Sequence, residues 1–236
     1  MKFEDDPIGL AIWDYATNGP SENIVVESDI CDNDIIPVPY LFRDLNEMPE
    51  LEQIALRKVK GHTLDIGAGA GCHSKELIKR GIQVTAIDTS LGAVDYCISE
   101  GLNAKQKDIL DLKGEKFDTL LILMNGLGLA ETLEKMPAFL KHLKSLLNPN
   151  GKIICDSADI KYIFEDEEGG MWIDLNAKYY GEMKFKMSYK NIESNWFSWI
   201  YIDQEKLKEI CSEVGLSCEI IFEGNNNNYL TELKHL

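Results

Sequence analysis

The chain has 236 residues and a formal net charge of −16 at pH 7. Nine acidic residues stand against a single lysine among the first 34 residues, which argues against nucleic acid as a partner because a polyanion needs a basic surface. No apolar run is long enough to span a bilayer, and the acidic N-terminus lacks the apolar segment of a signal peptide. We therefore expect no membrane partner and a cytoplasmic protein.

The first 60 residues are predicted to form an N-terminal cap that is partly helical and partly irregular. A helix is predicted from Pro7 to Asn18, since an acidic N-cap precedes it and Asn-Gly ends it. Residues 20–47 contain three prolines and are predicted to be irregular. A second helix, with an apolar stripe, is predicted to begin at Pro49.

A buried strand then ends in a carboxylate and three glycines. Residues 64–71 read Leu-Asp-Ile-Gly-Ala-Gly-Ala-Gly, and a helix is predicted to follow. Alternate glycines let the backbone turn sharply and approach a ligand that a Cβ would keep away. The helix directs unpaired N–H groups at whatever occupies the turn. Asp88 ends the next strand about 20 residues on, where an acid can hold a ribose diol. The segment predicts a nucleoside site.

Two kinds of nucleoside fit this turn, and its charge separates them. The dinucleotide fingerprint G-x-G-x-x-G/A, counted from Gly67, puts its third small residue at Cys72. Asp65 precedes the first glycine by two residues and would face the mouth of the turn. A carboxylate about 4 Å from a pyrophosphate costs roughly 4 kcal/mol at an effective dielectric near 20, whereas beside an ammonium or a sulfonium it is favourable. The charge favours a cationic nucleoside.

Strands alternate with helices from residue 62 to residue 156, which predicts a doubly wound, mostly parallel α/β sheet. The strands are predicted at 62–66, 82–87, 102–105, 117–124 and 152–155, and the helices at 72–80, 90–100 and 131–147. Beyond them, residues 182–190 alternate apolar and polar side chains, and residues 196–202 follow across a turn, so the two segments predict a β-hairpin. A helix around residues 207–214 and two strands, 218–222 and 229–233, close the chain.

Four elements in order resemble class I S-adenosylmethionine-dependent methyltransferases. Residues 65–71 look like the first motif of that family and residues 84–88 like the second. Asp108-Ile109 matches the third motif, and the strand that ends at Asn125-Gly126 matches the fourth. The resemblance implies a cofactor-binding domain over residues 61–236. Its Rossmann-like sheet would have seven strands, with an antiparallel closing strand and an insertion, residues 157–202, after the fifth strand.

The resemblance also implies a role for each motif residue toward S-adenosyl-L-methionine. Asp65, or the main chain at Gly67, would take the methionine amino group, and Asp88 would accept both ribose hydroxyls. Asp108 would accept the adenine amine while Ile109 offers its N–H. The implied cofactor-binding residues are Asp65, Gly67, Ala68, Gly69, Gly71, Asp88, Thr89, Asp108, Ile109, Asn125 and Gly126.

Several residues keep two interpretations. An aspartate at a strand end is often only a turn former or helix N-cap, most readily at Asp108. Arg43 would bind the methionine carboxylate or form a structural ion pair, and His73 would act in the site or in packing. No general base emerges, and alignment alone can drive methyl transfer. The scattered cysteines and histidines lack metal-ligand spacing, so we expect no metal.

The acceptor is expected to be a small molecule enclosed by residues 1–60 and the insertion, where Trp172, Tyr179 and Tyr180 follow a Gly-Gly loop. The loop after the fourth strand lacks the Asn-Pro-Pro-Tyr motif of enzymes that methylate adenine in DNA or glutamine. Alternatively, the hairpin at 182–202 forms a homodimer interface. The competing functions are an NAD-type oxidoreductase, a non-catalytic nucleoside-binding module and an aminopropyl transferase.

Overall fold

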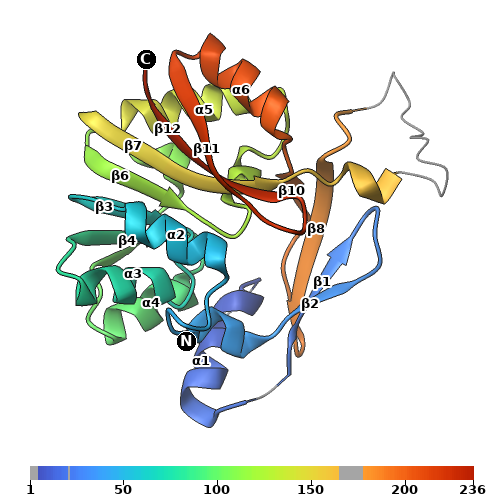
Figure 1. Cartoon of the computed structure of the whole chain (residues 1–236). Coiled ribbons are helices and arrows are strands. Elements are labelled where there is room, and N and C mark those ends of the chain that lie inside the picture. The colour runs from blue at the N-terminus through green and yellow to red at the C-terminus, as the bar shows by residue number, and fades with distance from the viewer. Residues whose placement is uncertain (1–4, 21, 165–177) are drawn as a thin grey trace.

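The computed structural model describes residues 5–20, 22–164 and 178–236, and two β-sheets organise them (Figure 1). The larger sheet has the strand order β11-β12-β7-β6-β3-β4-β5. Its strands are β3 (Thr63–Ile66), β4 (Val84–Asp88), β5 (Ala104–Gln106), β6 (Phe117–Ile122), β7 (Leu147–Ala158), β11 (Leu216–Glu223) and β12 (Asn228–His235). The five strands β3 to β7 are parallel, and β12 runs antiparallel to both of its neighbours. The sheet predicted from the sequence is confirmed.

Helices cover both faces of the larger sheet because its strands are apolar on both sides. Leu120 and Ile122 of β6 face the core formed with α5 and α6, whereas Leu121 and Leu123 face the core formed with α2 and α3. This is the two-residue alternation of a strand buried on both faces. The helices of the two layers are α2 (Glu50–Lys58), α3 (Cys72–Lys79), α4 (Leu91–Ser99), α5 (Met136–Ser145) and α6 (Gln204–Glu213).

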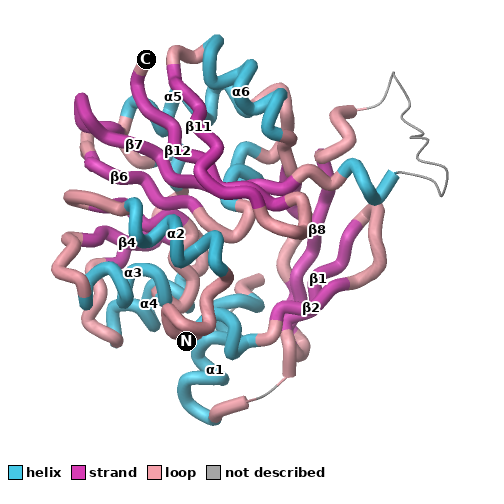
Figure 2. Tube along the Cα trace, viewed as in Figure 1, coloured by secondary structure: helices cyan, strands magenta, loops and turns pink. Residues whose placement is uncertain are grey.

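The smaller sheet joins a segment near the N-terminus, residues 24–36, to a segment that follows β7, residues 182–200. It has the order β10-β8-β1-β2, with β9 paired to β8, and stands beside the larger sheet (Figure 2). Its strands are β1 (Ile24–Ser28), β2 (Asp34–Ile36), β8 (Glu182–Tyr189), β9 (Ile192–Glu193) and β10 (Phe197–Ile200). The predicted hairpin is confirmed as β8 and β10. The prediction that residues 20–47 are irregular is wrong, because β1 finds its antiparallel partner β8 far along the chain.

The first helix, α1 (Pro7–Asn18), fastens this sheet to the core. Its N-cap Asp6 accepts an N–H from Gly9 at 2.8 Å, and the same carboxylate accepts from Ser90 Oγ at 2.9 Å and from Gly92 N at 3.0 Å at the start of α4. The Trp13 indole donates to the Gly92 carbonyl at 2.9 Å. The predicted helix is thus confirmed, and its N-terminus lies against the end of β4.

Four short 3-10 turns complete the elements of the described residues. They are η1 (Val38–Phe42), η2 (Ile109–Asp111), η3 (Gly126–Ala130) and η4 (Lys161–Phe164). Across the described ranges, no helix has the length and apolar character needed to cross a membrane. The domain boundary at residue 60 stays a prediction.

Candidate active site

The glycine turn after β3 has two kinds of glycine. Gly67, Gly69 and Gly71 all have positive φ values, +73°, +53° and +77°, which L side chains rarely adopt. A Cβ on Gly67 or Gly69 would meet no atom within 4 Å, whereas one on Gly71 would lie 2.5 Å from Leu102. The first two therefore line open space at the end of the sheet. Gly71, the glycine that departs from the dinucleotide fingerprint, instead lets the turn pack on the core.

Asp88, at the end of β4, holds this turn in place. Its Oδ2 accepts the Gly69 N–H at 2.9 Å and its Oδ1 accepts the Ser90 N–H at 2.9 Å. Desolvation raises the pKa of Asp88 despite these two donors. Thr89, the next residue, is exposed, and its carbonyl accepts from Gln106 at 3.0 Å. Each Asp88 oxygen keeps a second lone pair that can accept a ribose hydroxyl. The ribose contact stays a prediction.

Asp65 lies below the same turn and is only 2% exposed. The Ser74 hydroxyl, in the first turn of α3, donates to its Oδ2 at 2.6 Å. Burial raises the pKa of Asp65, while His73 and the Ser74 hydrogen bonds lower it. A carboxylate this buried is expensive to ionise unless a cation is near. The predicted contact of Asp65 with the positively charged end of a ligand stays a prediction.

Asp108 and Ile109 lie where β5 leads into η2. The Asp108 side chain accepts the Leu110 N–H at 2.8 Å and so caps this turn, while the residue itself is exposed. Ile109 is buried. The structure therefore shows Asp108 in the capping role that the sequence left open. Its contact with adenine stays a prediction.

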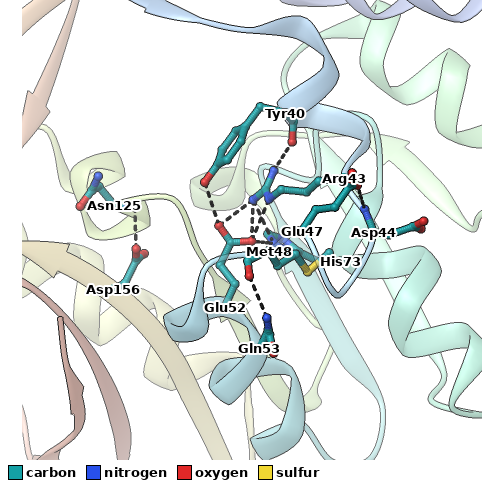
Figure 3. Close-up of polar contacts among 10 residues, drawn as sticks. All are labelled: Tyr40, Arg43, Asp44, Glu47, Met48, Glu52, Gln53, His73, Asn125 and Asp156. Carbon is teal, nitrogen blue, oxygen red and sulfur yellow. Dashed lines mark hydrogen bonds and ion pairs between the residues drawn. The ribbon is translucent and has the colours of Figure 1, made fainter. Parts of the chain in front are cut away.

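A carboxylate that the sequence reasoning missed, Asp156, organises the loop after β6. Asp156 follows the part of β7 that borders β6, and one of its oxygens accepts the N–H of Asn125 at 3.0 Å (Figure 3). Its other oxygen accepts the N–H of Gly126 at 3.2 Å. Burial raises the pKa of Asp156 to about 6. The signal was present: an acid directly follows the apolar run of the fifth strand.

Arg43 and His73 meet at a second carboxylate that the sequence did not reveal, Glu52 of α2. Arg43 Nη2 lies 2.6 Å from Glu52 Oε1, and His73 Nε2 lies 2.8 Å from Glu52 Oε2 (Figure 3). The guanidinium also lies 3.9 Å from the centre of the Tyr40 ring. Burial acts to raise the pKa of Glu52, but His73 and Arg43 together hold it below its usual value. The ion pair is therefore the role that the structure shows for Arg43.

The fold and the residues at its carboxyl edge together define a class of protein. A seven-stranded, doubly wound sheet with one antiparallel strand carries a glycine turn and three desolvated aspartates at the carboxyl edge of its parallel strands. Ligands of open α/β sheets bind at that edge. This is the Rossmann-like methyltransferase fold, with a site that suits a cationic nucleoside.

The chain belongs to the S-adenosylmethionine-dependent methyltransferases. A crystal structure of such an enzyme from Bacteroides fragilis, in complex with S-adenosyl-L-homocysteine, is 40% identical and has a TM-score of 0.93. The match covers 100% of this chain and 97% of that one. A family model described as a methyltransferase domain matches residues 63–151. A search of curated proteins gives no match.

More distant structures share the fold alone. A methyltransferase from Clostridium acetobutylicum is 13% identical, with a TM-score of 0.56 over 78% of this chain and 87% of that one. An amino pentose methyltransferase from Micromonospora echinaspora is 14% identical, with a TM-score of 0.53 over 81% of this chain and 94% of that one. The family model and the 40% identical enzyme, not these distant structures, show that the protein is a methyltransferase that uses S-adenosylmethionine, as predicted.

The residues present fit this cofactor. The open space beside Gly67 and Gly69 admits a ligand against the main chain, and Asp65, Asp88 and Asp156 are desolvated carboxylates whose ionisation a cation would favour. When bound, S-adenosylmethionine supplies a methyl group on a positively charged sulfur. The glycine turn would receive this group, and the three carboxylates would supply negative charge beside it.

Replacing Asp65 by asparagine is expected to weaken S-adenosylmethionine binding more than adenosine binding, because adenosine lacks the cationic amino-acid end. Calorimetry on both ligands measures the difference. The control is Ser74→Ala, which removes the hydroxyl that donates to Asp65 but keeps the negative charge. Equal losses for both ligands in Asp65→Asn would reduce Asp65 to a residue of the turn.

Asp156 is expected to make cofactor preference depend on pH. With its pKa near 6, the carboxyl is ionised at about pH 7 and mostly neutral at about pH 5. The preference for S-adenosylmethionine over S-adenosylhomocysteine, which lacks the sulfonium charge, should therefore fall severalfold from about pH 7 to about pH 5, and should not depend on pH in Asp156→Asn. Ligand titrations at both pH values test this. A wild-type preference that does not change would place the sulfonium away from Asp156.

The same pKa shift has a consequence for the ligand-free protein. The folded-state pKa of Asp156 lies above the ordinary value of 3.8, so ionisation opposes folding. Relative to Asp156→Asn, the wild type should lose stability as the pH rises from 3.8 to about 6, and the difference should stay constant above that pH.

Proposed function

We propose that the methyl acceptor is a small molecule bound between the smaller sheet and the carboxyl edge of the larger one. The observation that carries this proposal is the contact of Trp199 with Gly128: a Cβ on Gly128 would lie 2.0 Å from two ring atoms of that indole. The β10 strand of the smaller sheet thus lies directly on η3, the turn that follows β6. Residues of the insertion therefore border the edge that we propose to hold the acceptor.

The face of the smaller sheet that carries Trp199 is aromatic. Phe197 and Phe185 are opposite each other in the β10–β8 register, and Trp199 is opposite Met183, so these side chains share one face. Tyr201 packs on Phe185 with ring centroids 6.4 Å apart. The aromatic side chains of this face are partly buried and offer an apolar wall to an acceptor.

Charge also supports a small acceptor over a nucleic acid. The carboxylates around the cofactor turn, together with the net charge of −16, would repel a polyanion. Of the predicted lid aromatics, Trp172 lies outside the described residues. Tyr179 donates to Asp203 at 2.6 Å and Tyr180 to Asp159 at 2.8 Å, so both hydroxyls are engaged at the insertion's return to the core.

The homodimer predicted through residues 182–202 stays a prediction. Strand β8 pairs with β10 on one side and β1 on the other, so both of its edges are used within the chain. Trp196, just before the start of β10, is exposed, so this large apolar side chain is available to a partner. The cytoplasmic location also stays a prediction.

The proposed acceptor class is tested by measuring S-adenosylhomocysteine release from a panel of small amines, alcohols and thiols, run beside DNA, RNA and protein acceptors. We expect turnover with at least one small molecule and none with the polymers. The matched control is Asp88→Ala, whose weaker cofactor binding should lower turnover when S-adenosylmethionine is limiting. Robust methylation of a polymer, with no small acceptor, would overturn the proposal.

A further inference from the structure

Two aspartates from distant parts of the chain meet where α1 begins and β4 ends. Asp6 is the N-cap of α1, and Asp88 is the last residue of β4. Ser90, two residues after Asp88, is the N-cap of α4, and α1 lies beside α4 (Figure 1). A single serine therefore separates the N-terminal helix from the carboxylate predicted to hold the ribose.

Ser90 joins the two carboxylates by hydrogen bonds. Its N–H donates to Asp88 Oδ1 at 2.9 Å, and its hydroxyl donates to Asp6 Oδ2 at 2.9 Å. The hydroxyl oxygen also accepts the Ala93 N–H at 3.0 Å, so the serine side chain is held from two sides. Asp88 Oδ2 in turn accepts the Gly69 N–H at 2.9 Å. A chain of hydrogen bonds thus runs from α1 to the glycine turn.

The contact between α1 and α4 depends on a glycine in α1. Asp6 Oδ2 accepts the Gly92 N–H at 3.0 Å, and the Trp13 indole donates to the Gly92 carbonyl at 2.9 Å. A Cβ on Gly9 would collide with the Asp6 carboxylate and would lie 2.8 Å from Gly92 Cα. Alanine is preferred over glycine inside a helix, so the contact with Asp6, and not the helix, accounts for the glycine.

Asp6 affects Asp88 in two opposite ways. Burial is the main cause of the raised pKa of Asp88, and the negative charge of Asp6 raises it further. Through its charge, Asp6 therefore opposes the ionised form of Asp88, which is the stronger acceptor. Through Ser90, Asp6 instead fixes the donor on Oδ1 and so the direction in which the second lone pair of that oxygen points. The two effects predict opposite results when Asp6 is removed.

We propose that Asp6 is a positioning residue for the cofactor: acting through Ser90, it orients Asp88 toward the ribose hydroxyls of S-adenosylmethionine. The inference rests on the predicted ribose contact of Asp88 and is independent of the acceptor proposed above. It gives the N-terminal helix a part in cofactor binding, with Asp6 acting only through its neighbours.

The test measures how strongly the protein distinguishes adenosine from 2′,3′-dideoxyadenosine, which lacks the ribose hydroxyls. Wild type should bind adenosine at least about tenfold tighter, the gain expected from hydrogen bonds to a charged acceptor. Asp6→Ala should reduce this ratio about threefold or more, because Asp88 is then free to turn. A merely structural role would lower both affinities equally and leave the ratio unchanged. Calorimetric titration with each nucleoside gives the ratio.

Two variants separate geometry from charge. Gly9→Ala keeps every charge and pushes the Asp6 carboxylate away from Ser90, so it should also reduce the ratio. Asp6→Asn removes the charge but keeps one accepting oxygen, so its ratio should fall between those of wild type and Asp6→Ala. The matched control is Asp5→Asn, which neutralises the neighbouring exposed acid and should leave the ratio unchanged.

A double variant tests whether Ser90 is the link. Ser90→Ala removes the hydroxyl that Asp6 accepts but keeps the N–H on Asp88. It should reduce the ratio as Asp6→Ala does, and the two losses should not add in the double variant, because both break the same connection. Additive losses would mean that Asp6 and Ser90 act separately.

Each outcome supports or overturns the inference. A ratio that is unchanged or higher in a folded Asp6→Ala protein would overturn it, and a higher ratio would show that the charge of Asp6 dominates. If that variant does not fold, as its melting curve would show, Gly9→Ala and Asp6→Asn decide by the same ratio. Equal binding of the two nucleosides by wild type would overturn the ribose contact of Asp88 and the positioning role with it. The small-molecule acceptor is tested separately by the acceptor panel.

Discussion

Replacing Asp88 by alanine is expected to weaken S-adenosylmethionine binding by at least tenfold while the protein stays folded. Two losses combine. Hydrogen bonds from ligand hydroxyls to a charged acceptor contribute roughly 1.5–3 kcal/mol each, and each 1.4 kcal/mol is about tenfold in affinity. The substitution also releases the Gly69 N–H, which Asp88 holds at 2.9 Å, so the turn itself loosens. Calorimetric titration of the folded variant measures the effect.

Two variants sharpen the interpretation. Asp111→Ala removes an exposed acid near the same edge of the sheet and should leave affinity unchanged, which controls for net charge. Asp88→Asn keeps one accepting oxygen for Gly69 but lacks the charge, so it should fall between wild type and Asp88→Ala. Full affinity in a folded Asp88→Ala protein would mean that Asp88 carries no ribose.

Replacing Glu52 by alanine is expected to lower the free energy of unfolding by about 3–5 kcal/mol, because it leaves Arg43 and His73 buried without their shared carboxylate. Arg43 and Glu52 are each 4% exposed and His73 is 6% exposed, so water does not replace the lost carboxylate. For a protein of this size, the melting temperature should fall by roughly 6–20 °C. Denaturation followed by circular dichroism gives both numbers.

The control for Glu52 is an exposed ion pair. Lys135 and Glu131 lie 2.6 Å apart on the surface, and Lys135→Ala should change stability by less than about 1 kcal/mol.

The pH dependence of the stability that Glu52 contributes has a definite sign. Because the pKa of Glu52 is held below its ordinary 4.5, its contribution is present above that value and is lost as the pH falls through the folded-state pKa. The difference in unfolding free energy between wild type and Glu52→Gln should therefore narrow as the pH falls through that value. A gap that is constant with pH would contradict the buried ion pair.

The sequence by itself determined the core sheet and the cofactor. The alternation of apolar strands with amphipathic helices is local, and so are the three glycines that give the turn its left-handed backbone. Asp65 and Asp88 follow from the same logic, since an acid at the end of a parallel strand lies at the ligand edge wherever the strand sits in the sheet. These features needed no knowledge of distant contacts.

Only the tertiary structure decided how the site is enclosed and braced. Strand β1 looks irregular in sequence, because its short run is bounded by polar and proline-rich segments, and it becomes a strand by pairing with β8. Glu52 and Asp156 look like ordinary acids until folding buries the first beside Arg43 and the second beneath the Asn125 bend. Pairing across more than a hundred residues and desolvation of a carboxylate depend on which surfaces meet, and no local pattern encodes that.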